Sequence, residues 1–218
     1  MQANKVSLGG RSKITPLALA AEVGIPPNPT GVIVMPYGAL GSSSHPGIRR
    51  IATGLQRRGF ATIQTELLTA AEAAHGYHTF DIDLLAERIR AITDWLREQD
   101  DFADLPIGYF GAGADAGAVL AAAAERECPV SALVLSFARP DLAHDALPLV
   151  RAPILFITGE DEFELQLHRD AVARCRCHGV IETIEGASSH LYAPDTAHHQ
   201  IRLAGDWFTI HLDGRQAD

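Results

Sequence analysis

The chain has 218 residues, of which 47% are hydrophobic, and this size suits one α/β domain with a sizeable core. Its 18 basic and 27 acidic residues give a net charge of −9, which argues against a nucleic-acid-binding protein, because such a protein needs a basic patch to neutralise phosphates. No apolar run is long enough to cross a bilayer, and the first residues lack the apolar core of a secretory signal, so we expect a cytoplasmic protein without a membrane partner.

Short apolar runs alternate along the chain with segments of helical periodicity. A Pro-rich stretch at 24–31 cannot be helix interior and indicates a connection from an N-terminal strand or hairpin. Strands are then predicted at 31–37, 60–68, 106–113, 132–138, 153–159 and 179–187. Helices are predicted at 46–59, 81–99, 114–127, 165–176 and 194–212, with a short one at 141–147. This alternation predicts a single α/β domain over 1–218 with a doubly wound, mostly parallel sheet.

The cysteines do not predict a disulfide framework or a metal site. There are three, Cys128, Cys175 and Cys177, and an odd, small number is not typical of a disulfide-stabilised fold. Cys175 and Cys177 are separated by one residue rather than two, and no second pair exists to complete a zinc site. We expect free thiols on or near a helix, no metal, and no cofactor, because no phosphate-binding glycine motif is present.

The turn after the strand at 106–113 has the sequence of a nucleophile elbow. In a parallel α/β sheet, ligands bind at the carboxyl ends of the strands, so the turns at those ends carry the chemistry. Here Gly111, Ala112, Gly113 and Ala114 lead directly from strand to helix, and a strained elbow needs such small neighbours. The alternative is a tight turn whose small residues only permit close packing.

Two later turns could supply an acid and a base. Asp161, between Glu160 and Glu162, follows the strand at 153–159 and could orient a histidine, although a solvated acidic turn would have the same sequence. His190 follows the last strand and precedes the last helix, but it is one of ten histidines, most of which we expect on the surface or in packing. The order of elbow, acid and histidine is that of an α/β-hydrolase triad.

With these motifs the chain resembles the dienelactone hydrolase family of α/β hydrolases, from about Gly31 to Leu212. The resemblance is carried by GVIVMPYGALGSSS, FDIDLLAERIRAITDWLRE, LPIGYFGAGADAGAVLAAAAE, LVRAPILFITGEDE and EGASSHLY. It implies an α/β-hydrolase fold without a large cap domain, and cleavage of esters or lactones by a Cys or Ser nucleophile with an Asp and a His. By position, the acid falls on Asp161 and the base on His190.

The sequence departs from the family pattern at two places. Gly113 stands where the family has its nucleophile, and Asp115 stands where the family has a small residue. In the first loop, Pro36-Tyr37-Gly38 replaces the His-Gly that many relatives use for the oxyanion hole. Loss of a triad serine lowers kcat by about 10⁶-fold, so ordinary ester hydrolysis is not expected.

The resemblance also suggests residues that surround the substrate, a small molecule. The oxyanion-hole candidates are Tyr37, Gly38 and Ala114, and the substrate-pocket candidates are Tyr37, Ser42, Ser43 and Tyr192. The oligomeric state stays open between a monomer and a homodimer.

Three functions remain open. The first is a non-hydrolytic enzyme of lyase, cyclase or isomerase type, in which Asp161 orients His190 for acid–base chemistry. The second is a hydrolase or dehalogenase with Asp115 as nucleophile, because 113–117 also spells G-x-D-x-G, the elbow of dehalogenases and epoxide hydrolases in this superfamily. The third is a pseudoenzyme that kept the fold and acts by binding.

Overall fold

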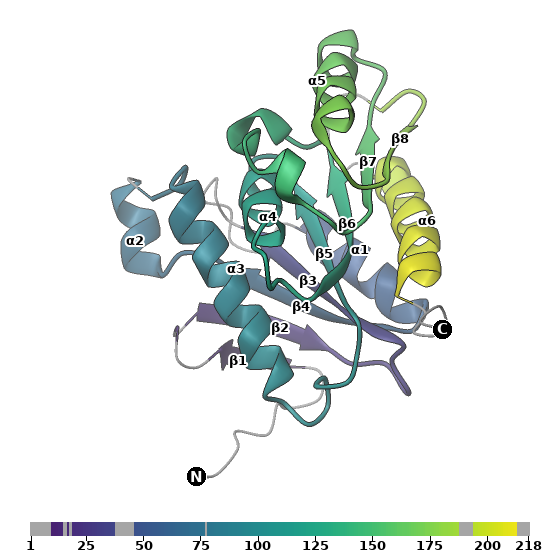
Figure 1. Cartoon of the computed structure of the whole chain (residues 1–218). Coiled ribbons are helices and arrows are strands. Elements are labelled where there is room, and N and C mark those ends of the chain that lie inside the picture. The colour runs from purple at the N-terminus through teal and green to yellow at the C-terminus, as the bar shows by residue number, and fades with distance from the viewer. Residues whose placement is uncertain are drawn as a thin grey trace.

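The computed structural model describes residues 10–14, 17, 19–37, 46–76, 78–187 and 194–212. In this part of the chain eight strands form one sheet (Figure 1). In their order across the sheet they are β1 (Gly10–Ile14), β2 (Leu19–Gly24), β4 (Phe60–Glu66), β3 (Gly31–Tyr37), β5 (Ile107–Ala112), β6 (Val130–Ser136), β7 (Ile154–Thr158) and β8 (Gly179–Thr183). From β4 to β8 every neighbouring pair is parallel, and β1 and β2 form an antiparallel edge, so the predicted fold class is confirmed.

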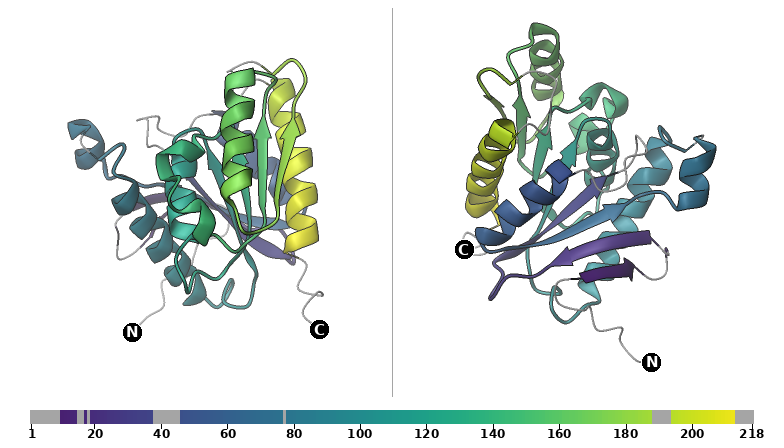
Figure 2. Two further views of the ribbon diagram at one scale, coloured as in Figure 1. Left: turned by 45° about the horizontal axis from the view of Figure 1, so that its top comes forward. Right: turned by 180° about the vertical axis from the view of Figure 1, so that it is seen from behind.

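Helices cover both faces of the sheet (Figure 2). The helices are α1 (Pro46–Arg57), α2 (Ala70–His75), α3 (Ile82–Arg97), α4 (Asp115–Ala123), α5 (Glu162–Arg174) and α6 (Pro194–His211). The apolar faces of α1 and α6 pack with one side of the sheet, and those of α3, α4 and α5 pack with the other. In the described part of the chain, no helix is both long and apolar enough to cross a membrane.

Most predicted elements exist, with ends moved by local turns. The helix expected at 114–127 ends at Ala123, and the segment expected as a helix at 141–147 forms two separate 3₁₀ turns, Pro140–Ala143 and Leu147–Leu149. The strand expected at 179–187 ends at Thr183, because the chain then turns through Gly186, which has φ +67°.

Helix α2 was not predicted, because none of its residues is buried and it therefore has no apolar periodicity. A capping box starts it: the Thr69 hydroxyl accepts the Glu72 N–H, and the Glu72 carboxylate accepts the Thr69 N–H. Arg88 of α3 binds the same carboxylate, with Nη2–Oε1 at 2.6 Å, and also donates to the Leu67 carbonyl. These hydrogen bonds from Arg88 and Thr69 lower the pKa of Glu72 to about 2 and hold the turn after β4 to α3.

Candidate functional site

Gly113 forms the turn between β5 and α4 with a backbone that side chains rarely adopt. Its φ is +55°, and a Cβ placed there would have no heavy atom within 4 Å. Its N–H donates to the Ser136 carbonyl at 3.1 Å, and its carbonyl accepts the Arg139 N–H at 3.0 Å. A left-handed residue between a central strand and a helix is the geometry of a nucleophile elbow, so the turn here presents open space instead of a reactive side chain.

The two residues after Gly113 have ordinary helical geometry. Ala114 has φ −72° and ψ −28° and lies at the N-cap of α4, and Asp115 is the first residue of that helix. A carboxylate in the first turn of a helix is stabilised by the helix dipole. The positive φ that marks an elbow therefore belongs to Gly113 and not to Asp115.

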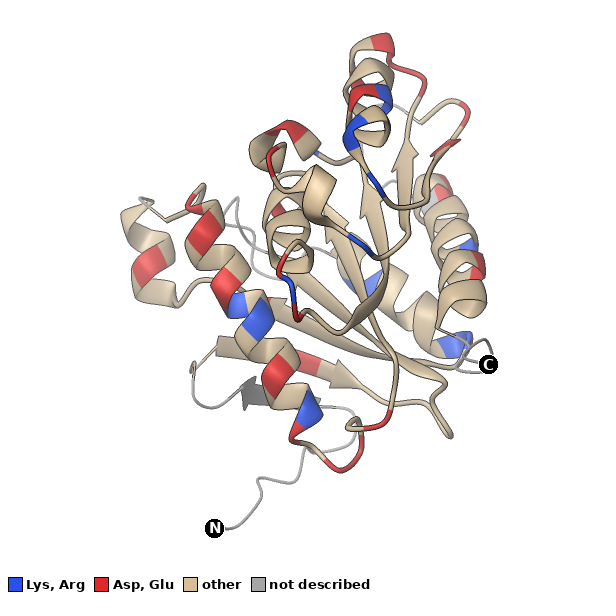
Figure 3. Cartoon of the chain, in the orientation of Figure 1, with Lys and Arg blue, Asp and Glu red and all other residues tan. Residues whose placement is uncertain are grey.

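Asp161 lies where β7 passes into α5, and its carboxylate caps that helix. Its Oδ1 accepts the Glu164 N–H at 3.0 Å, and the side chain is exposed. Two further carboxylates that we did not predict lie beside it. Glu160 accepts the Gly186 N–H at 3.1 Å, and Glu164 accepts the Thr158 hydroxyl at 3.3 Å. These turns and the start of α5 form an acidic edge of the molecule (Figure 3).

The connections that follow β7 and β8 are in contact. A Cβ added to Gly159 would lie 2.3 Å from the Ala187 carbonyl oxygen, so only glycine allows this approach. Gly159 is two residues before Asp161, and Ala187 is three residues before His190. The two chain segments that carry the candidate acid and base therefore start side by side.

Several candidate residues lie outside the described part of the chain: Gly38, Ser42, Ser43, His190 and Tyr192. Tyr37 is described as the half-buried last residue of β3, and Ala114 follows β5, the parallel neighbour of β3. One of these oxyanion-hole candidates therefore ends a strand and the other follows the adjacent strand, so both lie at the same edge of the sheet.

A pocket of about 670 Å³ opens at the carboxyl ends of β6 and β7. It is lined by Phe137, Ala138, Arg139, Glu160, Asp161, Phe163, Glu164, Leu167, Gly186 and Ala187. Arg139, whose N–H binds Gly113, forms a bidentate pair with Asp141 at 2.8 and 2.7 Å, which lowers the pKa of Asp141 and raises that of Arg139. The guanidinium is thus already neutralised, and the pocket is acidic with apolar walls.

Backbone strain is also found at the end of β6. Phe137 has φ +47°, which is costly for a residue with a large side chain, and its N–H donates to the Ile157 carbonyl at 2.7 Å. Strained residues of this kind gather at functional sites. No sequence signal indicated the left-handed backbone of Phe137.

Behind the elbow, a buried polar pair joins α6 to the sheet. The Gln200 amide donates to the Ser136 hydroxyl at 3.0 Å, and both side chains are buried. Ser136 is also the residue whose carbonyl receives the Gly113 N–H. Sequence reasoning missed this pair, whose members are 64 positions apart.

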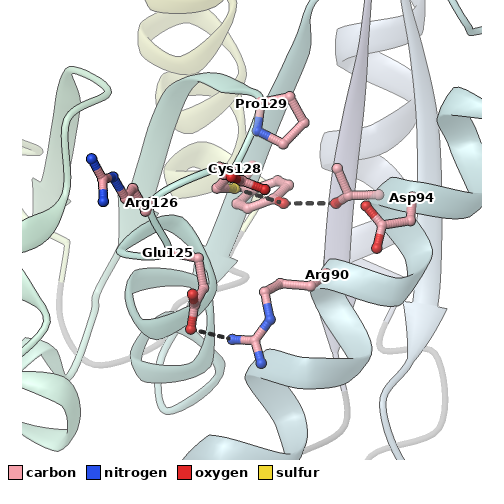
Figure 4. A pocket seen from close by; sticks show the side chains of 9 residues that line it. Arg90, Asp94, Glu125, Arg126, Cys128 and Pro129 are labelled. Atoms are coloured by element: carbon pink, nitrogen blue, oxygen red, sulfur yellow. Dashed lines mark hydrogen bonds and ion pairs between the residues drawn. The ribbon is translucent and has the colours of Figure 1, made fainter.

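A second pocket, of about 390 Å³, lies at the other end of the strands, where Cys128 and Pro129 precede β6 (Figure 4). At its floor the buried Tyr109 hydroxyl is 2.6 Å from the Thr93 hydroxyl and 3.5 Å from the Cys128 sulfur, and burial raises the pKa of Tyr109. Arg90 and Glu125 pair across its rim at 3.3 Å. Because ligands of such sheets bind at the carboxyl ends of the strands, the first pocket is the candidate site.

No family model matches this chain. Its structure superposes on the crystal structure of a dienelactone hydrolase from Anabaena variabilis ATCC 29413 with a TM-score of 0.87 and 35% sequence identity, covering 94% of this chain and 97% of that one. The chain belongs to the dienelactone hydrolase family. Est1E from Butyrivibrio proteoclasticus shares the fold at 14% identity, with a TM-score of 0.71 over 93% of this chain and 100% of that one.

Two curated relatives of this dienelactone hydrolase family member come from Mycobacterium tuberculosis, strains CDC 1551 / Oshkosh and ATCC 25618 / H37Rv. Both are provisionally named phosphoribosyl transferases, and each is 41% identical over 201 residues. The match covers 91% of this chain but 45% of each relative, so the chain spans about half the length of the curated relatives it matches.

Proposed function

We propose that this protein is a non-hydrolytic enzyme, of lyase, cyclase or isomerase type, in which His190 moves protons on a small organic substrate and Asp161 orients His190. The observation that carries the proposal is the geometry of Gly113, which has the backbone of a nucleophile elbow and open space where the nucleophile's side chain would lie. In the sequence, the acid and the histidine follow their strands as in the family, whereas glycine stands at the nucleophile position.

The proposed proton transfer depends on which group can offer a proton to His190. In a serine hydrolase the histidine takes its proton from the nucleophile. With glycine at position 113, a substrate can enter the open space and offer its own acidic C–H or O–H to His190. A positioned general base contributes about 10²–10⁴-fold to such a proton transfer.

The arrangement of the acid supports this role. One oxygen of Asp161 accepts the Glu164 N–H, which fixes the carboxylate at the start of α5 and leaves the other oxygen for an imidazole N–H. The contact between Gly159 and Ala187 brings together the segments that lead to Asp161 and to His190. This contact is the structural reason for pairing these two residues.

An aspartate nucleophile has less support. The G-x-D-x-G reading needs the strained turn at Asp115, but the left-handed residue is Gly113 and Asp115 lies in the first turn of α4. An acid at that position is stabilised by the helix dipole without any catalytic role.

Phosphoribosyl transfer also has less support as the activity of this chain. A phosphoribosyl donor carries a diphosphate, and the pocket carries the carboxylates of Glu160, Asp161 and Glu164, while Arg139 is already paired with Asp141. Like charges at such a site disfavour binding.

Proton transfer can be measured apart from hydrolysis. The protein is incubated in D₂O with a panel of unsaturated lactones, esters and ketones, and NMR follows both deuterium entry next to the carbonyl and ring opening or ester cleavage. We expect exchange or double-bond isomerisation without cleavage, reduced about 10²–10⁴-fold in His190→Ala.

Gly113→Ser is the matched variant, because it restores the missing hydroxyl and should shift the balance toward cleavage. Cleavage by the wild type, or exchange that is unchanged in His190→Ala, would contradict the proposal. Specific binding without exchange or cleavage across the panel would instead identify a pseudoenzyme.

A further inference from the structure

Two cysteines lie together at the end of α5, away from the first pocket. Cys175 ends the helix: its N–H donates to the Ala171 and Val172 carbonyls at 3.1 and 3.2 Å, and its backbone then becomes extended. Cys177 follows two residues later, just before the segment that pairs with β7. The two thiols therefore occupy the short link between α5 and β8.

The local backbone turns both thiols to the same side. Cys175 and Cys177 are half-buried and pack against the core on the α5 face, while Arg174, Arg176 and His178 are exposed. This alternation is that of an extended chain, in which residues two apart share a face. A hydrogen bond joins the Cys175 and Cys177 side chains, and both cysteines are free thiols.

The hydrogen bond makes the two thiols chemically different. As the acceptor, Cys177 has its pKa lowered to about 7, and the same bond together with burial raises the pKa of Cys175. The thiolate is the nucleophile in thiol chemistry, so Cys177 is the group that attacks and Cys175 the group that follows. The exposed Arg174 and Arg176 beside the pair favour an anionic reaction partner.

We propose that Cys175 and Cys177 form a thiol–disulfide exchange site that takes low-molecular-weight, anionic disulfides. The Cys177 thiolate attacks one sulfur of the disulfide R–S–S–R, and one R–S⁻ leaves, which gives a mixed disulfide on Cys177. Cys175 then loses its proton to water and attacks the Cys177 sulfur, and the second R–S⁻ leaves. The protein dithiol is oxidised by two electrons, and the small disulfide is reduced to two thiols.

The Cα spacing of the two cysteines is compatible with a disulfide. Two residues apart in an extended chain, Cα atoms are separated by about 6.6 Å, which is within the usual disulfide range of about 4.4–6.8 Å. Closure also requires the two Cβ atoms to come within about 3.5–4.5 Å, so the link between the cysteines must tighten when the bond forms.

Cys128 provides a matched control within the same chain. It is half-buried, and its sulfur lies 3.5 Å from the Tyr109 hydroxyl. It precedes β6, so it lies at the opposite end of that strand from the first pocket. No second thiol is described beside it. It should therefore form neither an internal disulfide nor a rapid adduct.

The test uses the reduced full chain and oxidised glutathione, with intact mass followed over time. We expect the wild type and Cys128→Ser to lose two hydrogens per chain without keeping glutathione. Cys175→Ser should accumulate one glutathione on Cys177, because the serine hydroxyl still donates the hydrogen bond but cannot attack. Cys177→Ser should react about tenfold more slowly than Cys175→Ser, because burial raises the pKa of the Cys175 thiol that remains of the pair.

Trypsin locates the bond, since cleavage after Arg174 and after Arg176 separates the two cysteines into peptides that only a disulfide keeps joined. Circular dichroism confirms that each serine variant is folded. Stable glutathione on the wild type, a joined peptide that contains Cys128, or equal rates for Cys175→Ser and Cys177→Ser would overturn the proposal. The outcome is independent of His190 and of the proposed reaction.

Discussion

Replacement of Gly113 by alanine should destabilise the protein through backbone strain alone. A non-glycine residue in the left-handed region costs about 1–2 kcal/mol, and the open space around the Cβ adds no steric cost. For a chain of 218 residues, this corresponds to a fall in Tm of about 2–4 °C per kcal/mol. Gly113→Ser should show the same loss, because its hydroxyl also enters open space.

Urea unfolding measures this loss, and the slope with urea concentration should stay unchanged if only the folded turn is strained. Gly76→Ala is the control, since Gly76 has φ +68°, ends α2, and also has no heavy atom near its missing Cβ. A change below about 0.3 kcal/mol at Gly113 would mean that the turn leaves the left-handed region, and a loss above about 3 kcal/mol would mean that the added atom clashes. Either result would refute the elbow geometry.

Substitutions at three further positions test the surroundings of the site. Asp161→Ala should lower the free energy of unfolding by about 1 kcal/mol, because the Glu164 N–H loses its capping acceptor, whereas Asp161→Asn should keep the stability and lose turnover. Equal unfolding of the two variants in urea would contradict the capping role. Gly159→Ala should destabilise the protein by about 1–3 kcal/mol and lower His190-dependent turnover, because the added Cβ would lie 2.3 Å from the Ala187 carbonyl oxygen. If neither stability nor turnover changed, the contact between these two segments would have no role. Burial lowers the pKa of His168 below its value in the unfolded chain, so the stability that the neutral side chain provides is present above about pH 6.5 and is lost as the pH falls below that value. His168→Leu should therefore make the free energy of unfolding less sensitive to acid between about pH 7.5 and 5.5. An unchanged sensitivity would contradict this role of His168.

The fold could be predicted from the sequence because its central strands are buried on both faces. In β3 and β5 nearly every residue is buried, so both strands are apolar runs that end in turns. Helix α3 shows its buried face as a regular apolar spacing. By contrast, α2 depends on the pair between Glu72 and Arg88, and no apolar pattern in the sequence reports it.

The candidate site was predictable only where one short motif sets the geometry. The small residues around Gly113 indicated the elbow, and its positive φ agrees with that prediction. The bond between Gln200 and Ser136 was not predictable, because it joins elements that are distant in the sequence, and no local motif indicated the left-handed backbone of Phe137. The acid–base pair of Asp161 and His190 stays a prediction, since His190 lies outside the described residues.

The central claim is that Gly113 occupies a nucleophile elbow beside a working base, and fluorophosphonate labelling tests it most directly. Such a probe reacts with a serine that an adjacent histidine activates. We predict that the wild type and Gly113→Ala stay unlabelled, that Gly113→Ser becomes labelled at position 113, and that adding His190→Ala removes the label. Labelling of the wild type, or a folded Gly113→Ser variant that stays inert, would contradict the account.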